Sequence, residues 1–256
     1  MEYLIISCVA FLTSLLTLFS GFGLGTLLMP VFALFFPINI AIVLTGIVHL
    51  FNNIFKLIIF RKYAKKEIII KFGIPAFFLS IFGAMVLNWL SILKPLFCYE
   101  LFSYSFCIIP IKLIISLLLI LFLFFEIIPY LANIKFHEKY LPLGGAFSGF
   151  LGGLSGHQGA LRSAFLIRCN LSKESFIGTG VVIACMVDLS RLFIYINKLP
   201  NALMHDYFLI GLAIGFAFLG TLFGNKLFKK VTYKVLQKIV SIMLFIFAIC
   251  LGCGII

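Results

Sequence analysis

Long apolar runs recur through this chain, each about as long as a bilayer is thick. A helix needs roughly 20 apolar residues to cross the hydrocarbon core. Only 11% of the residues are charged, against roughly 25% in soluble domains. The runs are continuous and do not alternate with polar residues, which excludes a transmembrane β-barrel. We therefore expect an all-α polytopic membrane protein, with residues 1–256 forming a single transmembrane domain. Uninterrupted spans are expected at about 38–60, 69–90, 107–131, 174–196, 207–226 and 235–256.

Two further apolar regions are broken by glycines. Residues 4–36 are interrupted at Gly21-Phe22-Gly23-Leu24-Gly25 and again at Pro30. Residues 141–168 contain Leu154–Ser163, which gathers glycines, a histidine, an amide, two hydroxyls and an arginine within ten residues. Non-helical polar backbone is tolerated at membrane depth only where protein buries it or where it lines a cavity. We interpret the second region as the wall of a binding site.

The two broken regions hold matching places in an internal repeat, which predicts two related halves at about 4–131 and 141–256. The same features follow each other in both: a broken segment, a Thr-Gly helix, a polar helix end and a glycine-containing helix. The alignment places Gly21–Gly25 on Ser155–Gly159, Thr45-Gly46 on Thr179-Gly180, Asn53 on Asp188, Lys56 on Arg191, and Phe82-Gly83 on Leu219-Gly220.

The distribution of Lys and Arg favours an inverted repeat. If both broken regions re-enter on the side where they start, fourteen basic residues collect on one side and only Lys94, Lys112 and Lys198 on the other. If all eight segments cross, the division is nearly even. The positive-inside rule favours the first arrangement, and inverted repeats with discontinuous helices recur in secondary transporters. Because residues 4–20 are nearly long enough to cross, the first region either spans or re-enters, and six to eight membrane segments are expected.

Four charged residues lie well inside the predicted membrane segments. Lys56, Arg162 and Arg191 are cationic, and Asp188 is the clearest anion, with Glu126 nearer a helix end. Because a charge at the bilayer centre costs roughly 2.5–3.5 kcal/mol, such residues usually face the protein interior. Asp188 and Arg191 are spaced to pair on one helix face. Snorkelling to the headgroups is the alternative for Lys56 and Arg191. Helical spacing predicts two polar stripes, each along one helix face. The first contains Thr45, His49, Asn52, Asn53 and Lys56, and the second contains Asp188, Arg191 and Tyr195.

Arg162 follows Gly159, where a half-helix would begin. Its free N–H groups would favour an anion, and the guanidinium suits carboxylate or sulfonate oxygens. Alternatively, Arg162 bonds helix-end carbonyls or Asp188. His157 titrates near neutrality, so we expect His157 or Asp188 to couple protons, unless His157 is a packed and hydrogen-bonded structural side chain. The expected substrate-binding residues are Arg162, Gln158, Ser155, Gly156, Gly159, Ser163, Arg191, Lys56 and Asn53.

Other features indicate no catalytic residue, metal or cofactor. The seven cysteines are expected to be small buried side chains in apolar helices, and Cys250 and Cys253 lack the second pair of ligands that a metal site needs. Met1–Leu4 has no basic n-region, so we expect it to begin the first membrane segment. Tyr99, Phe102, Tyr104 and Phe106 are typical of an interfacial loop. The net charge of +12 lies mostly in short loops, where it orients the chain in the bilayer and does not indicate nucleic acid.

Two motifs resemble the TauE/SafE sulfite-exporter family, also called TSUP transporters. They are Gly-Phe-Gly-Leu-Gly ahead of Pro30, and Gly-Gly-Leu-Ser-Gly-His-Gln-Gly-Ala-Leu-Arg-Ser followed by Thr-Gly-Val-Val and Asp188-Leu-Ser-Arg191. The resemblance covers nearly the whole chain. It implies a multi-pass permease of the bacterial inner membrane for small anions such as sulfite, sulfoacetate or thiosulfate, driven by the proton gradient. The first half departs from the second, because Leu28 stands where Arg162 is expected.

We therefore expect a secondary transporter of small anions and no enzymatic activity. One rival is a non-transporting membrane subunit that supports a partner protein. The other is an intramembrane enzyme using His157, His49 and Asp188, although no HExxH or GxSxG motif is present. The sequence leaves open the anion, the direction of transport, the coupling ion and whether the chain forms a homo-oligomer.

Overall fold

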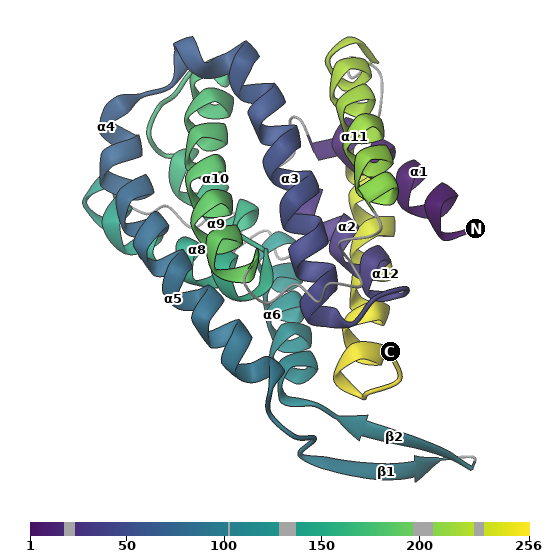
Figure 1. Ribbon diagram of the computed structural model, residues 1–256. Coiled ribbons are helices and arrows are strands. Elements are labelled where there is room, and N and C mark those ends of the chain that lie inside the picture. Colours follow the sequence, from purple (N-terminus) through teal and green to yellow (C-terminus); the bar gives the residue numbers. More distant parts are fainter. Residues whose placement is uncertain (18–23, 102, 128–136, 197–206, 228–232) are drawn as a thin grey trace.

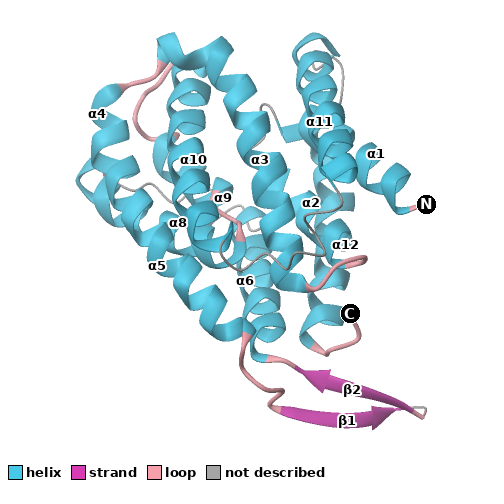
Figure 2. Cartoon of the chain, viewed as in Figure 1, coloured by secondary structure: helices cyan, strands magenta, loops and turns pink. Residues whose placement is uncertain are grey.

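The protein is a bundle of helices with one β-hairpin projecting from its lower end (Figure 2). The computed structural model describes residues 1–17, 24–101, 103–127, 137–196, 207–227 and 233–256. Four helices within them are long and apolar enough to cross a membrane: Ile38–Tyr63, Lys66–Ser91, Lys173–Ile196 and Tyr207–Gly224. Shorter apolar helices accompany them. The predicted helical membrane protein is therefore confirmed in class.

The described part of the first half contains the helices and the hairpin shown in Figure 1. Helix α3 continues into a 3-10 turn, and α4 runs through a π-helical turn into α5. The elements are α1 (Glu2–Thr17), α2 (Leu24–Ala33), α3 (Ile38–Phe60), η1 (Arg61–Tyr63), α4 (Lys66–Ile68), η2 (Ile69–Gly73), α5 (Ile74–Ser91), β1 (Phe97–Leu101), β2 (Tyr104–Ile108) and α6 (Pro110–Ile127).

The second half begins with a helix that is broken in the middle of the molecule. Its elements are η3 (Glu138–Tyr140), α8 (Leu141–Ser155), α9 (Gly159–Leu166), α10 (Lys173–Ile196), α11 (Tyr207–Leu227) and α12 (Tyr233–Gly252).

Two details of the first half differ from the prediction. Pro30 does not interrupt a helix, because it lies inside α2. Cys107 and Ile108, expected at the start of a span, belong to strand β2, and the helix begins only at Pro110. A proline fits the first helical position, where its missing N–H costs nothing. The predicted break at Gly21–Gly23 lies outside the described residues, as does the side chain of Glu126.

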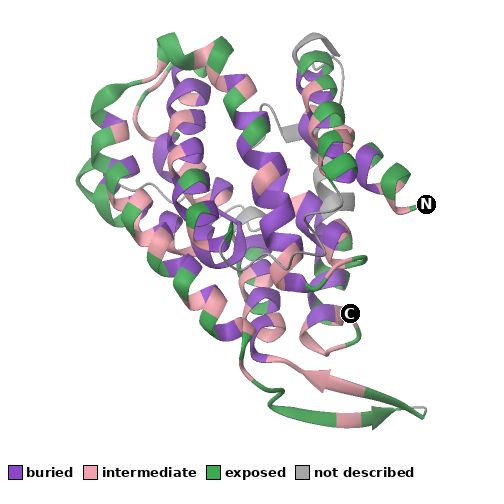
Figure 3. Cartoon of the chain, in the orientation of Figure 1, coloured by how far each residue is buried: buried purple, intermediate pink, exposed green. Residues whose placement is uncertain are grey.

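The helices pack in pairs that join the two halves. Helix α3 lies against α10 at the centre, α5 against α8, α1 against α11, and α6 against α12. Figure 3 shows α3 and α10 with mostly buried side chains, whereas α5 exposes one face. In a bilayer that exposed face contacts lipid, so large apolar side chains such as Phe78 and Phe82 stand on it.

Glycines let α8 approach α5 unusually closely. A Cβ added at Gly145, Gly149 or Gly153 would lie 2.1 Å from a backbone oxygen of the opposing helix segment. The three glycines are four residues apart and therefore share one helix face. Such small-residue faces allow membrane helices to pack backbone to backbone. The close contact fixes the depth at which α8 ends, and thus the position of the break.

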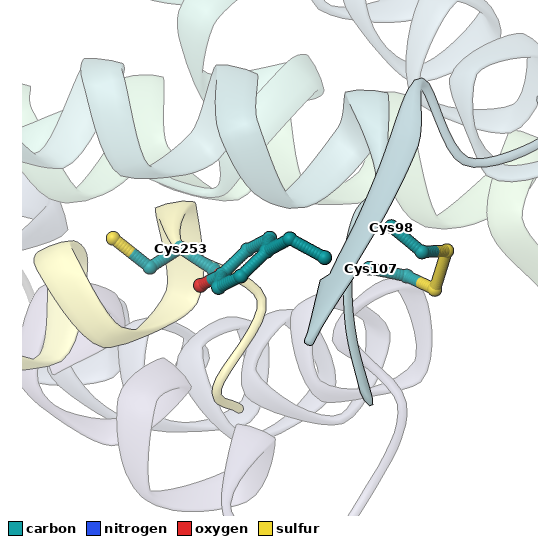
Figure 4. The surroundings of a disulfide bond; sticks show 4 residues. Cys98, Cys107 and Cys253 are labelled. Atoms are coloured by element: carbon teal, nitrogen blue, oxygen red, sulfur yellow. A yellow bond between two sulfur atoms is a disulfide. The ribbon is translucent and has the colours of Figure 1, made fainter. Parts of the chain in front are cut away.

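The hairpin replaces the loop expected between residues 91 and 107. Its strands pair antiparallel, with Cys98 opposite Cys107 and joined to it by a disulfide. The expectation that the cysteines are buried helical side chains is therefore wrong for this pair, because both stand on paired strands outside the bundle. Figure 4 shows the disulfide near Cys253 at the C-terminal end of the chain. The Tyr99 hydroxyl donates to the Cys253 carbonyl at 2.7 Å.

Candidate functional site

The polar stretch forms the predicted break between two half-helices. Helix α8 ends at Ser155 and α9 starts at Gly159. Gly156 between them has a φ of +82°, a conformation that glycine adopts without the steric cost a side chain would add. The first N–H groups of α9 have no partner within the helix. The C-terminus of one helix and the N-terminus of the other therefore meet inside the protein.

The start of α2 reaches the same place from the other half. A Cβ added at Gly25 would lie 3.2 Å from the carbonyl oxygen of Gly156 and 3.7 Å from Thr45 Cγ2. Gly25 is the last residue of the glycine motif in the first half, and Gly156 belongs to the motif of the second. The two motifs, 131 positions apart along the chain, thus meet at the centre of the bundle.

Asp188 on α10 is the hub of a buried polar network. Its Oδ1 accepts from Arg191 Nε at 3.0 Å and from Arg191 Nη2 at 2.8 Å. Its Oδ2 lies 2.6 Å from His49 Nδ1, and Asn53 Nδ2 donates to the same oxygen at 3.5 Å. All four side chains are buried. The expected pairing of Asp188 with Arg191 is found, and Asn53 meets Asp188, the residue with which the repeat aligns it.

Gln158 connects this network with Arg162. Its Nε2 donates to Asp188 Oδ1 at 3.1 Å, and its Oε1 accepts from Arg162 Nη1 at 3.3 Å. The side chain fits because position 152 is glycine: a Cβ there would lie 2.9 Å from Gln158 Cβ. The Arg191 side chain likewise occupies room left by a glycine, since its Nη2 lies 3.2 Å from a Cβ built at Gly46.

Lys56 and Arg162 add positive charge that no carboxylate balances. Lys56 is 6% exposed, and within the described chain neither residue forms an ion pair. Their cationic groups are near enough to repel each other electrostatically. Burial inside the protein rules out snorkelling for Lys56 and likewise for Arg191, which is fully buried. Arg162 is half-buried and makes its one described side-chain hydrogen bond to Gln158.

His157 occupies an apolar setting beside this network. Its ring stacks on Phe122 of α6 at a centroid distance of 5.8 Å. Both ring nitrogens are buried and have no hydrogen-bond partner in the described part of the chain. The packing of His157 agrees with the structural alternative raised from the sequence. The hydrogen bonds which that alternative also expects are not found among the described residues.

The serines of the predicted site are placed unequally. Ser155 is buried, and its hydroxyl donates to the Leu151 carbonyl at 2.9 Å, so its proton is committed to α8. Ser163 lies half-buried on α9, and its side chain forms no hydrogen bond to any described residue. Of the two hydroxyls, only that of Ser163 therefore has an O–H group that is not already donated to a described residue.

Several polar contacts of the core were not predicted. Thr221 of α11 donates to Asn52 Oδ1 at 2.8 Å, and Ser14 of α1 lies 2.7 Å from Thr221. The Tyr195 hydroxyl donates to the Gly153 carbonyl. Asn52 and Tyr195 stand in the stripes read from the sequence, whereas Ser14 and Thr221 carry no sequence signal, because isolated hydroxyls are common in membrane helices. These bonds join α1, α3 and α11 on one side and α8 and α10 on the other.

A separate groove of about 450 Å³ lies beside the polar centre between α6, α8 and α9. Its walls are entirely apolar and include Leu121, Phe122, Leu143, Phe147, Leu161 and Phe165. Phe122 belongs both to this wall and to the stack on His157. Since it offers no polar group, the groove does not suit a small inorganic anion.

One comparison with known proteins identified a relationship. The model of the family described as "Sulfite exporter TauE/SafE" matches residues 6–251, nearly the whole chain. No curated protein and no solved structure matches the chain. The matched range contains both glycine motifs, both polar stripes and every residue of the network around Asp188.

Proposed function

Because the chain belongs to the TauE/SafE family of sulfite exporters, we propose that it is a secondary transporter that carries a small sulfur-containing or organic anion, such as sulfite, thiosulfate or sulfoacetate, through the centre of the bundle. Transporter function and membrane embedding follow from the family and the four long apolar helices. The chemistry of the central residues supports the choice of an anion.

The observation that carries the proposal is an excess of positive charge in the centre of the bundle, from the buried Lys56 and Arg191 and the half-buried Arg162. Three cationic side chains, Lys56, Arg162 and Arg191, converge on a region where the described carboxylate is Asp188 alone. Arg191 forms an ion pair with that carboxylate, and no carboxylate of the described residues forms a direct ion pair with Lys56 or Arg162. An uncompensated buried charge costs several kcal/mol. A bound anion would remove this cost, whereas a cation would increase it.

Arg162 is the proposed anchor of the anion. A guanidinium has five N–H donors, and one of those of Arg162 is bonded to Gln158. The remaining donors, the first N–H groups of α9 after Gly159 and the Ser163 hydroxyl lie within one turn of helix. Helix N-termini favour anions through the same free N–H groups. We assign Lys56, Asn53, Gln158, Arg191, Gly156 and Ser155 to the same proposed anion site.

We propose that the His49–Asp188 pair exchanges the coupling proton. The two side chains are 2.6 Å apart and buried together, and histidine is the side chain that titrates nearest neutrality. His157, the other candidate, is separated from polar partners by its stack on Phe122. His49 was considered from the sequence only as part of the polar stripe and of the enzyme alternative, and its approach to Asp188 suggests this second role.

The packing supports the proposed inverted repeat of residues 4–131 and 141–256. Gly83 of α5 abuts the Phe150 carbonyl of α8, and its aligned residue Gly220 of α11 abuts the Phe11 carbonyl of α1. Each half thus receives the first helix of the other through an aligned glycine. Both polar stripes face the interior, which favours a transport path over a partner-binding surface. A single transport domain in a bacterial inner membrane is the arrangement we propose.

A transport assay in proteoliposomes tests the proposal. Purified protein is expected to carry labelled sulfite, thiosulfate or sulfoacetate in competition with each other, and not to carry inorganic cations. Arg162→Ala is expected to abolish the competition among these anions for transport. Leu28→Met changes the aligned position of the first half without altering charge, and is expected to preserve that competition. Full transport by Arg162→Ala would remove the proposed anchor, and transport of none of these anions would remove the proposed substrate class.

A further inference from the structure

The side chain of Gln158 touches both functional parts of the centre at once. Its oxygen accepts from Arg162 and its nitrogen donates to Asp188, at 3.3 and 3.1 Å. It is 2% exposed. Among the hydrogen bonds of the described residues, this amide is the one direct link between the proposed anion anchor and the carboxylate.

The two ends of the amide are not interchangeable. The oxygen can only accept and the nitrogen can only donate, so the guanidinium and the carboxylate together fix which way the amide points. The Gln158 backbone is held as well, because Ser148 Oγ donates to its carbonyl at 3.1 Å. The side chain therefore has little freedom while both bonds persist, and losing one bond frees it to leave the other.

Resting on the function proposed above, we infer that Gln158 couples anion binding at Arg162 to proton uptake by the His49–Asp188 pair. A bound anion attracts the guanidinium N–H groups and competes with Gln158 Oε1 for Nη1. Once released at that end, the amide no longer holds its N–H on Asp188 Oδ1. A carboxylate that loses a hydrogen-bond donor holds a proton more readily. The proton comes from water and stays on the pair until the anion leaves.

The coupling is reciprocal, because two linked binding events must strengthen or weaken each other by the same factor. Protonation of the pair therefore strengthens anion binding. Arg191 keeps two bonds to Oδ1 throughout and anchors the carboxylate in place. The charged and titratable groups that interact electrostatically with the pair are Arg191, Cys185 and Tyr195 of α10 and Arg162 of α9. Lys56 of α3 interacts with Arg162, and His157 of the break interacts with Arg191.

Two transport modes separate coupling from binding. Proteoliposomes with the purified full chain are assayed for exchange of labelled sulfite at equal pH and for net uptake driven by an imposed pH gradient. The wild-type protein is expected to show stimulation by the gradient of roughly fivefold or more, the lower end of ordinary coupling between sites. Gln158→Met, similar in length but without hydrogen-bonding groups, is expected to lose the stimulation, so that its net uptake relative to its own exchange rate no longer rises with the gradient. Protonation of sulfite itself cancels, because every variant meets the same probe and gradient.

Asn53→Leu is the matched control. It also removes an amide donor from Asp188 but leaves Arg162 untouched, so both modes are expected to slow together with their ratio preserved. Gradient stimulation retained by Gln158→Met, or lost equally in Asn53→Leu, would overturn the inference. Should Gln158→Met fail to fold, Gln158→Asn is too short to span both partners and is expected to show the same loss of stimulation. A wild-type protein that transports no anion would instead refute the proposed function, and one that transports without stimulation would refute proton coupling itself.

Discussion

The two halves of the molecule share their packing but differ in their charges. Helices α5 and α11 each use an aligned glycine, Gly83 or Gly220, to receive the first helix of the other half. At the centre, however, Asp188 and Arg191 of α10 form a closed ion pair, whereas the aligned Asn53 and Lys56 of α3 do not. The comparison indicates that the repeat accounts for the shared helix packing, and that the residues which differ between the halves form the proposed site. The following experiments test this difference, from the largest expected effect to the smallest.

The ion pair of the second half is expected to be essential for folding. Asp188→Asn leaves Arg191 buried without a counter-charge, and breaking a buried pair in this way costs roughly 3–5 kcal/mol. The aligned change in the first half, Asn53→Leu, removes a membrane hydrogen bond worth roughly 0.6–1.7 kcal/mol. Thermal unfolding of the purified variants in detergent measures both. Equal shifts in unfolding temperature would mean that the halves contribute alike.

Lys56 is expected to act on the anion and not on folding. Lys56→Met removes a buried cation that has no carboxylate partner, so the unfolding temperature is expected to stay the same or rise. Loss of one charge-assisted contact, worth roughly 1.5–3 kcal/mol, is expected to weaken sulfite binding, read from the competition curve of the transport assay. The aligned Arg191→Met serves as the opposite case, because it leaves Asp188 unpaired. A Lys56→Met protein that unfolds as readily as Arg191→Met would contradict the distinction.

The glycine contacts are expected to matter similarly in both halves. Gly83→Ala places a Cβ 2.1 Å from the Phe150 carbonyl oxygen, and the aligned Gly220→Ala places one 2.2 Å from that of Phe11. Overpacking of this kind costs roughly 1–3 kcal/mol. Gly215→Ala on α11 is the control, since nothing lies within 4 Å of its added Cβ. The unfolding temperature is expected to fall for the first two variants alone. A large loss in only one half would show that the shared packing is not equally important.

The disulfide hairpin is expected to affect transport least. Because the hairpin stands outside the helical centre, the double variant Cys98→Ser with Cys107→Ser should transport sulfite at close to the wild-type rate. Disulfides persist in oxidising compartments such as the bacterial periplasm, so we predict that this end of the bundle faces the periplasm. A membrane-impermeant maleimide should label Cys98 or Cys107 in intact cells only after reduction. Labelling that requires cell lysis would reverse the orientation.

The hairpin lies at the opposite end of the bundle from the basic turn of Arg61–Lys66 (Figure 1). The disulfide and the positive-inside rule therefore give the same orientation from independent physical causes. One depends on the redox state of a compartment, and the other on the cost of moving charge across a bilayer.

Periodic features of the sequence predicted the helical scaffold well. The apolar runs gave α3, α5, α10 and α11 to within a few residues, and the glycine cluster gave the break between α8 and α9. The i, i+3 spacing gave the pair of Asp188 with Arg191. The hairpin and its disulfide were missed, because the aromatic residues there fit an interfacial loop equally well and cysteine spacing does not specify pairing.

Local sequence thus determined the membrane class, the break and the helix faces that carry polar groups, because each depends on residues within a few turns of each other. Only the tertiary structure decided which of those groups meet. His49 and Asp188 are 139 residues apart, and Ser14 and Thr221 are 207 apart. Such contacts depend on how α10 packs against α3 and α1 against α11, which no helical period encodes. Within the described residues the same packing gives neither Lys56 nor Arg162 a direct ion pair, and the proposed anion site depends on that imbalance.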